Sequence, residues 1–433
     1  MTQFSQTLRL LGINEVLLNQ FAFDANFKKR VRKLTGFDYI LILLSNVSKD
    51  VMSYNTLASS LYKNPLKCVK RQALQKAMKN DNFLKFVNDV LNRVLMNKIG
   101  LPGSKLSRMF GRIVVQDSTI VKLPQRLFEL YSGIKNQSKQ VTNSRIQFTI
   151  DILKNSLIGM SIDPFSINDA KAAKILNPIA KDLILRDRGY FLISEICRII
   201  TAKAFFIYRY HPIYNYYHIK TGKVLDLQRH FRNRKMIDMQ VRLGGQDGPI
   251  VRLLAMTIDE KLANHRRFLI RRDKRNNPSK STLALLSWSI YLTNIEDESM
   301  SYSEIFELYK LRWRIEIIFK AIKSNLKLDS IHNVSEIQFK FIVTAKMIMI
   351  IIAIQYVYEP LVHIIKKIYK QDLSLLKLVR FIIDNGNVLR NLIEYVKQKK
   401  RNICKDLDNL SKYCCYDKRK RKNYEEAFAT ILS

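Results

Sequence analysis

Acidic residues are scarce in this sequence. Its 433 residues include 37 aspartates and glutamates but 74 lysines and arginines, so the formal net charge is +37 and the isoelectric point lies near 10.0. This excess goes beyond what solubility requires and predicts a polyanionic partner. Nucleic acid fits best, because counterion release favours a long basic contact with phosphates. An AT-rich genome would enrich lysine, but it does not explain the two-to-one ratio of basic to acidic residues.

Cysteine and histidine are also sparse. The five cysteines are odd in number and show no paired metal-ligand spacing, and the six histidines are scattered along the chain. This pattern argues against a disulfide framework and against a zinc site. It predicts a protein of the reducing cytoplasm.

Long hydrophobic runs are missing as well. The most apolar stretch, 347–354, lies between Lys346 and Gln355 and is too short to span a bilayer. Residues 1–5 show no basic region followed by an apolar core, which predicts no secretion signal and no membrane partner. Apolar residues are nevertheless plentiful at 47%, enough for the cores of two or three domains.

One segment combines charge and helical spacing. Tyr309, Arg312, Glu316 and Lys323 follow one another at offsets of three, four and seven residues. With about 3.6 residues per turn, one helix can direct all four side chains at a common site. There the carboxylate can hold a metal while the cations contact phosphate. The same spacing also fits a solvated helix face with an Arg/Glu pair.

The N-terminal part of the chain predicts helices with basic faces over 15–97. Segments 53–61 and 69–78 resemble a helix, a turn and a second helix. The second segment carries Lys70 and Arg71, residue types that contact phosphates and base edges. A DNA-reading motif and a plain helical bundle with exposed lysines fit this pattern equally well.

After a boundary at 101–104 the pattern changes to strands. We expect strands over 112–117, 144–153 and 157–162, a helix over 168–180, a strand over 183–187 and a helix over 191–202. Three meandering strands, a helix and a returning strand match a ribonuclease-H-like sheet. The basic, β-branched stretch 204–273 predicts mostly antiparallel strands, followed by a strand over 286–294 and a capping box at Ser301–Glu304.

The predicted fold class is therefore α/β, with a mixed ribonuclease-H-like sheet flanked by helices. The predicted domains are an N-terminal helical DNA-binding region (1–105), a catalytic domain (106–203 and 286–350), a β-rich insertion (204–285) and a C-terminal helical region (351–433). The basic run at 418–422 is interpreted as a solvated charge run.

Three carboxylates can converge in such a sheet. Asp117 and Asp187 end two expected strands that lie side by side, and the helix of Glu316 packs beside them. Such a set suits one or two Mg²⁺ ions, with Mn²⁺ as a substitute, which promote in-line displacement at phosphorus. Arg312 and Lys323 could then contact phosphate oxygens. Individually, Asp117 could cap the following Ser-Thr turn, and Asp187 could belong to an ordinary strand-to-helix turn.

These motifs resemble a known family. Tyr309, Arg312, Glu316 and Lys323 match the Y-R-E-K signature of the insertion-sequence-four family of bacterial DDE transposases. The segments 117–119, Asp-Ser-Thr, and 187–191, Asp-Arg-Gly-Tyr-Phe, resemble its two aspartate motifs, and the similarity runs from about residue 112 to 328.

The resemblance implies a function. Members of the family bind terminal inverted repeats of double-stranded DNA, usually as homodimers, cut the transposon ends and join them to target DNA with Mg²⁺. A bacterial cytoplasmic, nucleoid-associated protein is implied. Other possibilities are a ribonuclease-H-like nuclease that cuts without joining, and an inactive, transposase-derived DNA-binding protein.

The resemblance also extends to three further residues. Arg188 and Tyr190 match the second aspartate motif, whereas Gly189 between them leaves its local role open. Tyr309, like Arg312 and Lys323, is implied to contact the DNA backbone. Trp288 resembles an aromatic residue on which relatives stack a flipped base. Its alternative role is that of a strand tryptophan buried against the insertion.

Overall fold

The computed structural model describes residues 2–30, 33–62, 65–96, 105–133, 141–154, 156–272, 277–296, 299–329, 331–398 and 403–417. The expected boundary at 101–104 and the basic run at 418–422 lie outside these residues.

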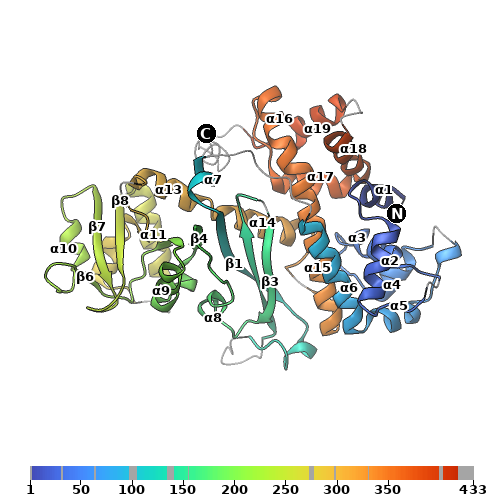
Figure 1. Cartoon of the computed structure of the whole chain (residues 1–433), viewed down its shortest axis with the longest axis horizontal. Coiled ribbons are helices and arrows are strands. Elements are labelled where there is room, and N and C mark those ends of the chain that lie inside the picture. The colour runs from blue at the N-terminus through green and yellow to red at the C-terminus, as the bar shows by residue number, and fades with distance from the viewer. Residues whose placement is uncertain are drawn as a thin grey trace.

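A mixed sheet of nine strands forms the centre of the described structure, in the order β3-β2-β1-β4-β5-β9-β8-β7-β6 (Figure 1). The strands are β1 (Arg112–Lys122), β2 (Asn143–Asp151), β3 (Ser156–Pro164), β4 (Asp182–Arg186), β5 (Phe205–Arg209), β6 (Tyr216–His218), β7 (Met236–Leu243), β8 (Ile250–Thr257) and β9 (Trp288–Thr293). β1 to β3 form an antiparallel meander, and β4 runs parallel to both β1 and β5. The chain is thus an α/β protein, as expected.

Alternation along β1 and β4 directs side chains into two different cores. Val115 and Leu185 belong to the larger core, which also contains residues of the helices α13 (Tyr302–Lys310) and α14 (Trp313–Asn325). Val114 and Ile184 point the other way, into the core that includes α9 (Ile193–Thr201). Because successive side chains of a strand face opposite sides, odd-numbered positions of both strands face α14.

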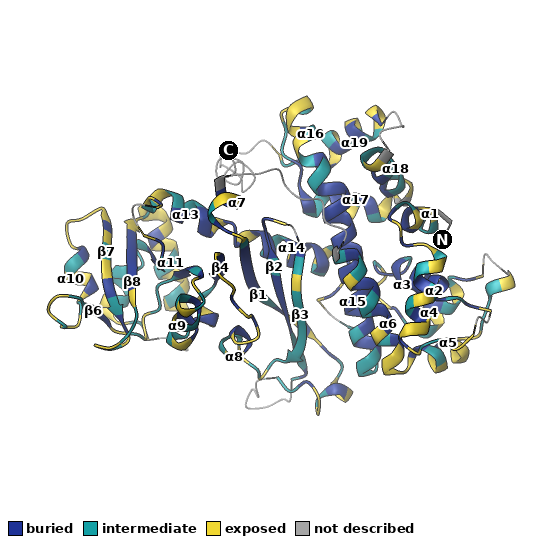
Figure 2. Cartoon of the chain, viewed as in Figure 1, coloured by how far each residue is buried: buried dark blue, intermediate teal, exposed yellow. Residues whose placement is uncertain are grey.

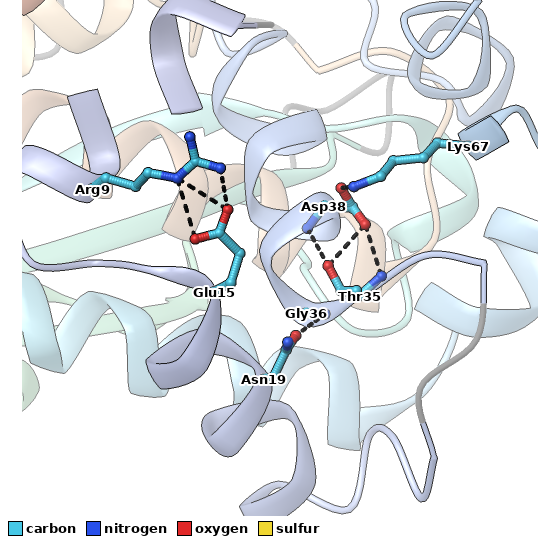
Figure 3. A network of polar contacts seen from close by, with 7 residues as sticks. All are labelled: Arg9, Glu15, Asn19, Thr35, Gly36, Asp38 and Lys67. Atoms are coloured by element: carbon cyan, nitrogen blue, oxygen red, sulfur yellow. Dashed lines mark hydrogen bonds and ion pairs between the residues drawn. The ribbon is translucent and has the colours of Figure 1, made fainter. Parts of the chain in front are cut away.

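Helices α1 to α6 precede the sheet, and α2 to α6 lie within the stretch 15–97 where helices are predicted. They are α1 (Thr2–Leu10), α2 (Glu15–Asp24), α3 (Gly36–Leu44), α4 (Tyr54–Ser59), α5 (Arg71–Met78) and α6 (Asp81–Met96), and α7 (Lys105–Met109) leads into β1. Polar contacts connect them (Figure 3): Arg9 Nε donates to Glu15 at 3.0 Å, and Lys67 Nζ pairs with Asp38 at 2.5 Å. Asp38 also completes a capping box with Thr35. The segment leading into α5 is therefore attached to α3.

Beyond the sheet the chain is again helical. These helices are α15 (Glu336–Ala353), a π-helical turn (Ile354–Tyr358), α16 (Glu359–Tyr369), α17 (Leu375–Asp384), α18 (Gly386–Gln398) and α19 (Cys404–Cys414). The continuous stretch Glu336–Tyr369 is long and apolar enough to cross a membrane by length and composition, but 89% of its most apolar window is buried inside the protein. α15 and the π-helical turn are buried along most of their length, whereas α16 carries exposed residues, drawn yellow in Figure 2, so the apolar character of α15 reflects packing in the core.

The stretch 204–273 differs from the prediction of mostly antiparallel strands. It contains the helices α10 (Leu227–Phe231) and α11 (Glu260–Arg272), and α12 (Lys280–Leu285) follows. α11 buries Ala263 and exposes Leu262, Phe268 and Leu269, so it has no inward apolar stripe from which a helix could be recognised. In addition, β5 pairs with β4 and thereby continues the main sheet, and β6 to β8 extend it through β9.

Two further expectations need correction. Asp117 lies in the middle of β1 and not at its end, because β1 continues to Lys122 in pairing with β2. The helix expected over 168–180 is confined to α8 (Asp169–Ala173), which begins with the predicted Asn168 cap. Lys174 follows α8 as its C-terminal cap, and three residues later Asn177-Pro178 follows, a proline that disfavours helix continuation.

Candidate catalytic site

The parallel pairing of β1 with β4 places two aspartates level with each other. The register joins Val115 to Leu185, an offset of 70 residues, and the same offset separates Asp117 from Asp187. Both are odd-numbered positions, so by alternation both side chains face α14. Asp187 directly follows the last residue of β4. Beyond this level β1 continues without β4 and stays paired with β2.

The segment that carries Glu316 is not one continuous helix. α13 begins with the predicted capping box and ends at Lys310, and α14 begins at Trp313. Between them the backbone bonds have i to i−3 spacing: Arg312 N–H donates to the carbonyl of Tyr309 at 3.2 Å, and Arg314 N–H to that of Leu311 at 3.1 Å. This tight 3₁₀ stretch separates Tyr309 on α13 from Glu316 and Lys323 on α14.

Arg312 lies at this junction and bridges two of the carboxylates. Its NH1 donates to Asp117 Oδ2 at 3.0 Å, and its NH2 donates to Glu316 Oε1. The guanidinium side chain is only 6% exposed, whereas the Glu316 side chain is 35% exposed. Arg312, Asp117 and Glu316 thus form one charge-assisted network near the carboxyl end of β4, with Arg312 buried and Glu316 partly open to solvent.

Electrostatics show that all three carboxylates share this site. Burial raises the pKa of Asp117 to about 6, although Arg312 lowers it, and the charges of Glu316 and Asp187 raise it further. Burial disfavours the charge of Arg312, but Tyr309 and the three carboxylates outweigh this effect and raise its pKa above the ordinary value. The guanidinium therefore remains charged beside Asp117, whose own pKa is raised.

The donor set fits a hard divalent cation in its chemistry. Carboxylate oxygens are the ligands that Mg²⁺ prefers, and Asp117, Asp187 and Glu316 supply them. Within the described residues, however, no three Asp, Glu, His or Cys side chains already stand together as a set of metal ligands. The bridging guanidinium of Arg312 takes up oxygens of two of the three carboxylates.

Tyr309 differs in position from the sequence prediction, whereas Lys323 lies on the helix of Glu316 as predicted. Tyr309 is 1% exposed, and its hydroxyl donates to the backbone carbonyl of Arg186 at 3.2 Å, so it does not face solvent. Arg209 and Arg312 lie over its ring at 5.5 and 5.8 Å from the centroid. Lys323 is partly buried, two turns beyond Glu316 on α14, and burial lowers its pKa.

A fourth acid, Asp169, escaped sequence analysis. Asp169 Oδ1 accepts hydrogen bonds from Ser118 Oγ at 2.8 Å and from Gln147 Nε2 at 2.9 Å, and Oδ2 pairs with Arg145 at 2.6 Å. A Cβ atom at Gly189 would lie 3.0 Å from the same Oδ2. Asp169 therefore connects the residue after Asp117 with the turn after Asp187, and this contact explains the glycine.

Tyr190 completes the same network from the second aspartate motif. Its hydroxyl donates to Gln147 Oε1 at 2.5 Å, and the side chain is 1% exposed. Burial raises its pKa. The sequence predicted that Tyr190 contacts DNA, but the structure places its side chain in the interior, bonded to Gln147. In the sequence, the predicted helix cap at Asn168–Asp169 was the only indication of the hydrogen-bond network around Asp169.

Trp288 and Arg188 line a common pocket of about 300 Å³ between β5, α11 and β9. Two more arginines, Arg209 and Arg266, line it as well, and burial together with the charges of Arg209 and Arg188 lowers the pKa of Arg266. The Trp288 ring is partly buried and packs at 4.7 Å from that of Phe231. Features of both sequence interpretations, an accessible aromatic surface and a packed strand residue, thus coexist.

Lys70 and Arg71 lie apart from the catalytic site. They are exposed at the start of α5, and Figure 1 shows α5 at the opposite end of the molecule from β6 to β8. Beside α5 is a groove of about 710 Å³ that sequence analysis did not find, because its walls come from separate segments. Its basic lining residues are Lys28, Lys29, Arg30, Lys33 and Lys76.

Comparison with known proteins identifies related sequences. The family model described as transposase DDE domain matches residues 108–352. The transposase for insertion sequence element IS231E of Bacillus thuringiensis subsp. finitimus is 25% identical, over 94% of this chain and 90% of the relative. The transposase for IS231C of Bacillus thuringiensis subsp. berliner is 26% identical over 95% and 90%, and that for IS1151 of Clostridium perfringens is 24% identical over 97% and 93%.

Among solved structures, the chain is similar to a piggyBac transposase synaptic complex with hairpin DNA. The TM-score is 0.46 at 12% identity, over 97% of this chain and 87% of that one. At this distance the likeness carries no part of the argument below.

Proposed function

This chain belongs to the DDE transposase family, and we propose that it is a DNA transposase that binds terminal inverted repeats, cleaves transposon ends and joins them to target DNA. The observation that carries this proposal is the meeting of Asp117, Asp187 and Glu316 around Arg312, just beyond the last parallel pair of β1 and β4. The family match spans both aspartates and the glutamate.

The residues have separate tasks in this reaction. Asp117, Asp187 and Glu316 would hold Mg²⁺, or Mn²⁺ in its place. When bound, the cation supplies Lewis-acid stabilisation for attack by water or a 3′-hydroxyl at phosphorus and for departure of the leaving oxygen. Arg312 and Lys323 bind phosphate oxygens of the DNA strand, and Tyr309 orients Arg312 from beneath.

The β1 to β5 order supports a ribonuclease-H-like catalytic domain. We assign 106–203 and 286–350 to that domain and 204–285 to an insertion, between an N-terminal helical region (1–105) and a C-terminal helical region (351–433). The continuity of the sheet through β9 makes this insertion an extension of the catalytic sheet. The insertion therefore holds DNA in a fixed position relative to the carboxylates.

DNA contacts outside the catalytic site follow from charge and exposure. Lys70 and Arg71 on α5 contact the inverted repeat, and Trp288 with Arg188 receives a flipped base and its phosphate in the arginine-lined pocket. Each transposon has two ends, so a homodimer in the DNA complex fits the reaction. The protein acts in the bacterial cytoplasm at the nucleoid.

The decisive test replaces each acid separately. Asp117→Ala, Asp187→Ala and Glu316→Ala should abolish Mg²⁺-dependent cutting of repeat-ended DNA while binding to that DNA persists. Asp163→Ala is a matched control, since Asp163 lies on β3, the edge strand of the same sheet, and accepts a hydrogen bond from Ser161. Undiminished cutting by all three variants would refute the assignment. A strand-transfer assay separates a transposase from a nuclease that cuts without joining, and an inactive descendant would do neither.

A further inference from the structure

We propose that Arg312 keeps the catalytic acids paired in the free protein and exchanges them for a DNA phosphate, so that DNA must bind before the divalent cation. Arg312 then acts as a positioning residue with two successive sets of partners. The inference rests on the proposed function, because it concerns the regulation of the same site.

The first observation is direct competition for ligand atoms. A guanidinium donates through a rigid fork, and here its two terminal nitrogens bond to Asp117 Oδ2 and Glu316 Oε1. A metal ion would require lone pairs of the same carboxylates. Because the Arg312 side chain is only 6% exposed, solvent screens its pair with Asp117 weakly, whereas the Glu316 carboxylate, at 35% exposed, stays accessible to water. In the free protein the metal ion therefore competes with the Arg312 guanidinium for these carboxylate oxygens.

The second observation is that Arg312 is incompletely satisfied. Its Nε is buried and has no hydrogen-bond partner among the described residues. A buried donor without a partner costs free energy, whereas a phosphate group can accept two parallel bonds from one guanidinium. The bridging arrangement is thus one that an entering phosphate can displace.

The third observation is the backbone at this position. Arg312 lies on the 3₁₀ stretch between α13 and α14, where the bonds of Arg312 and Ile315 reach back three residues instead of four. Such stretches inside helical segments often mark hinges. The next residue, Trp313, is 52% exposed, so the junction borders solvent. A small change at the junction redirects Arg312 without moving the core of either helix.

The surroundings also supply a place for the phosphate. Tyr309 is held by the carbonyl of Arg186, and its ring lies under both Arg209 and Arg312. A phosphate that reaches Arg209 and Arg312, which lie over this buried ring, meets two guanidinium groups. Once Arg312 turns to it, Asp117 and Glu316 lose their internal cation, and together with Asp187 they form a strongly negative site.

The experiment measures Mn²⁺ affinity by electron paramagnetic resonance, with no catalytic readout. Wild-type protein, Arg312→Gln and Arg312→Lys are titrated alone and bound to a duplex copied from the DNA that flanks the coding sequence. Complexes of Asp117→Ala with the same duplex give the baseline for Mn²⁺ held by DNA. Arg112→Gln is the matched control, because Arg112 forms a similar pair with Asp182 at the other end of the same strands.

Without DNA, Arg312→Gln should bind Mn²⁺ about tenfold or more tightly than wild type, as expected when charge-assisted bonds to two carboxylates are removed. Arg312→Lys, which keeps the charge but not the fork, should lie between them, and Arg112→Gln should match wild type. When wild type is bound to the duplex, its Mn²⁺ affinity should rise by the same factor. Circular dichroism checks that each variant is folded.

The outcomes are distinct. If Arg312→Gln is folded and binds Mn²⁺ no more tightly than wild type without DNA, the inference is wrong. If Arg312→Gln does not fold, wild type alone decides, since equal Mn²⁺ affinity with and without DNA also overturns the inference. If no protein binds Mn²⁺ above the Asp117→Ala baseline in any state, the proposed function itself fails.

Discussion

Lys346 offers a test of how α14, the helix of Glu316, is held in the fold. It lies in the middle of α15 with 1% of its surface exposed, and its ammonium donates to the carbonyl of Val47 at 2.6 Å and to that of Leu326. Leu326 caps the C-terminal end of α14, whereas Val47 follows α3. One buried cation therefore connects the helix of Glu316 to the N-terminal helices.

The cost of burying this charge can be derived from its pKa. Burial lowers the pKa of Lys346 from 10.5 to about 7, although Asp50 and Asp329 act to raise it. Between these two values the unfolded chain binds a proton that the folded protein does not, so stability must rise with pH in this window. From about pH 7 to about pH 9 the expected gain is about 2 kcal/mol. Neighbouring His332, whose pKa is lowered, titrates below this window.

We therefore expect the free energy of unfolding of wild type, relative to Lys346→Met, to increase by about 2 kcal/mol over that pH range. Urea unfolding followed by circular dichroism at several pH values measures it. Lys340→Met is the control, because Lys340 lies on the same helix in an accessible pair with Glu336. A difference between wild type and Lys346→Met that stays constant with pH would refute the reasoning.

Two further predictions concern the second aspartate motif and the arginine-lined pocket. Gly189→Ala should lower the free energy of unfolding by about 1 kcal/mol and reduce DNA cleavage, because the new methyl group would lie 3.0 Å from Asp169 Oδ2. Thermal melting measures the first effect and a DNA cleavage assay the second. An unchanged melting temperature with full cleavage would contradict the prediction. Trp288→Ala should reduce cleavage of DNA ends by about 10-fold or more, as lost base stacking requires, whereas Trp288→Phe should retain most of it. Equal activity of the alanine and phenylalanine variants would argue for a purely packed tryptophan.

Local sequence patterns determined a large part of the fold. The alternation over 144–153, the short apolar run before Asp187 and the capping box at Ser301 and Glu304 each lie within a few neighbouring residues, and all appear in the structure as expected. The excess of basic residues and the signature residues were likewise visible without coordinates. Such features depend on backbone periodicity and hydrogen bonding over one or two turns, which adjacent side chains control.

Other features depended on packing and could not be read locally. α11 was missed because its apolar residues face outward, and Asp169 because its partners come from β1, β2 and the turn at Gly189. The break between α13 and α14 was also invisible, since the residues at the junction are compatible with a continuous helix. The inward orientation of Tyr309 was not predicted either, because its hydroxyl donates to a backbone carbonyl on β4, far away in the sequence.

The sequence by itself thus determined the chemistry of the site: three carboxylates, their cationic neighbours and the strands and helix that carry them. Only the tertiary structure decided that Arg312 bridges Asp117, 195 residues away, and Glu316. The reason is physical. Residue types and local periodicity are properties of short segments, but the distance between two side chains far apart in the chain depends on sheet register and on how a helix packs across it.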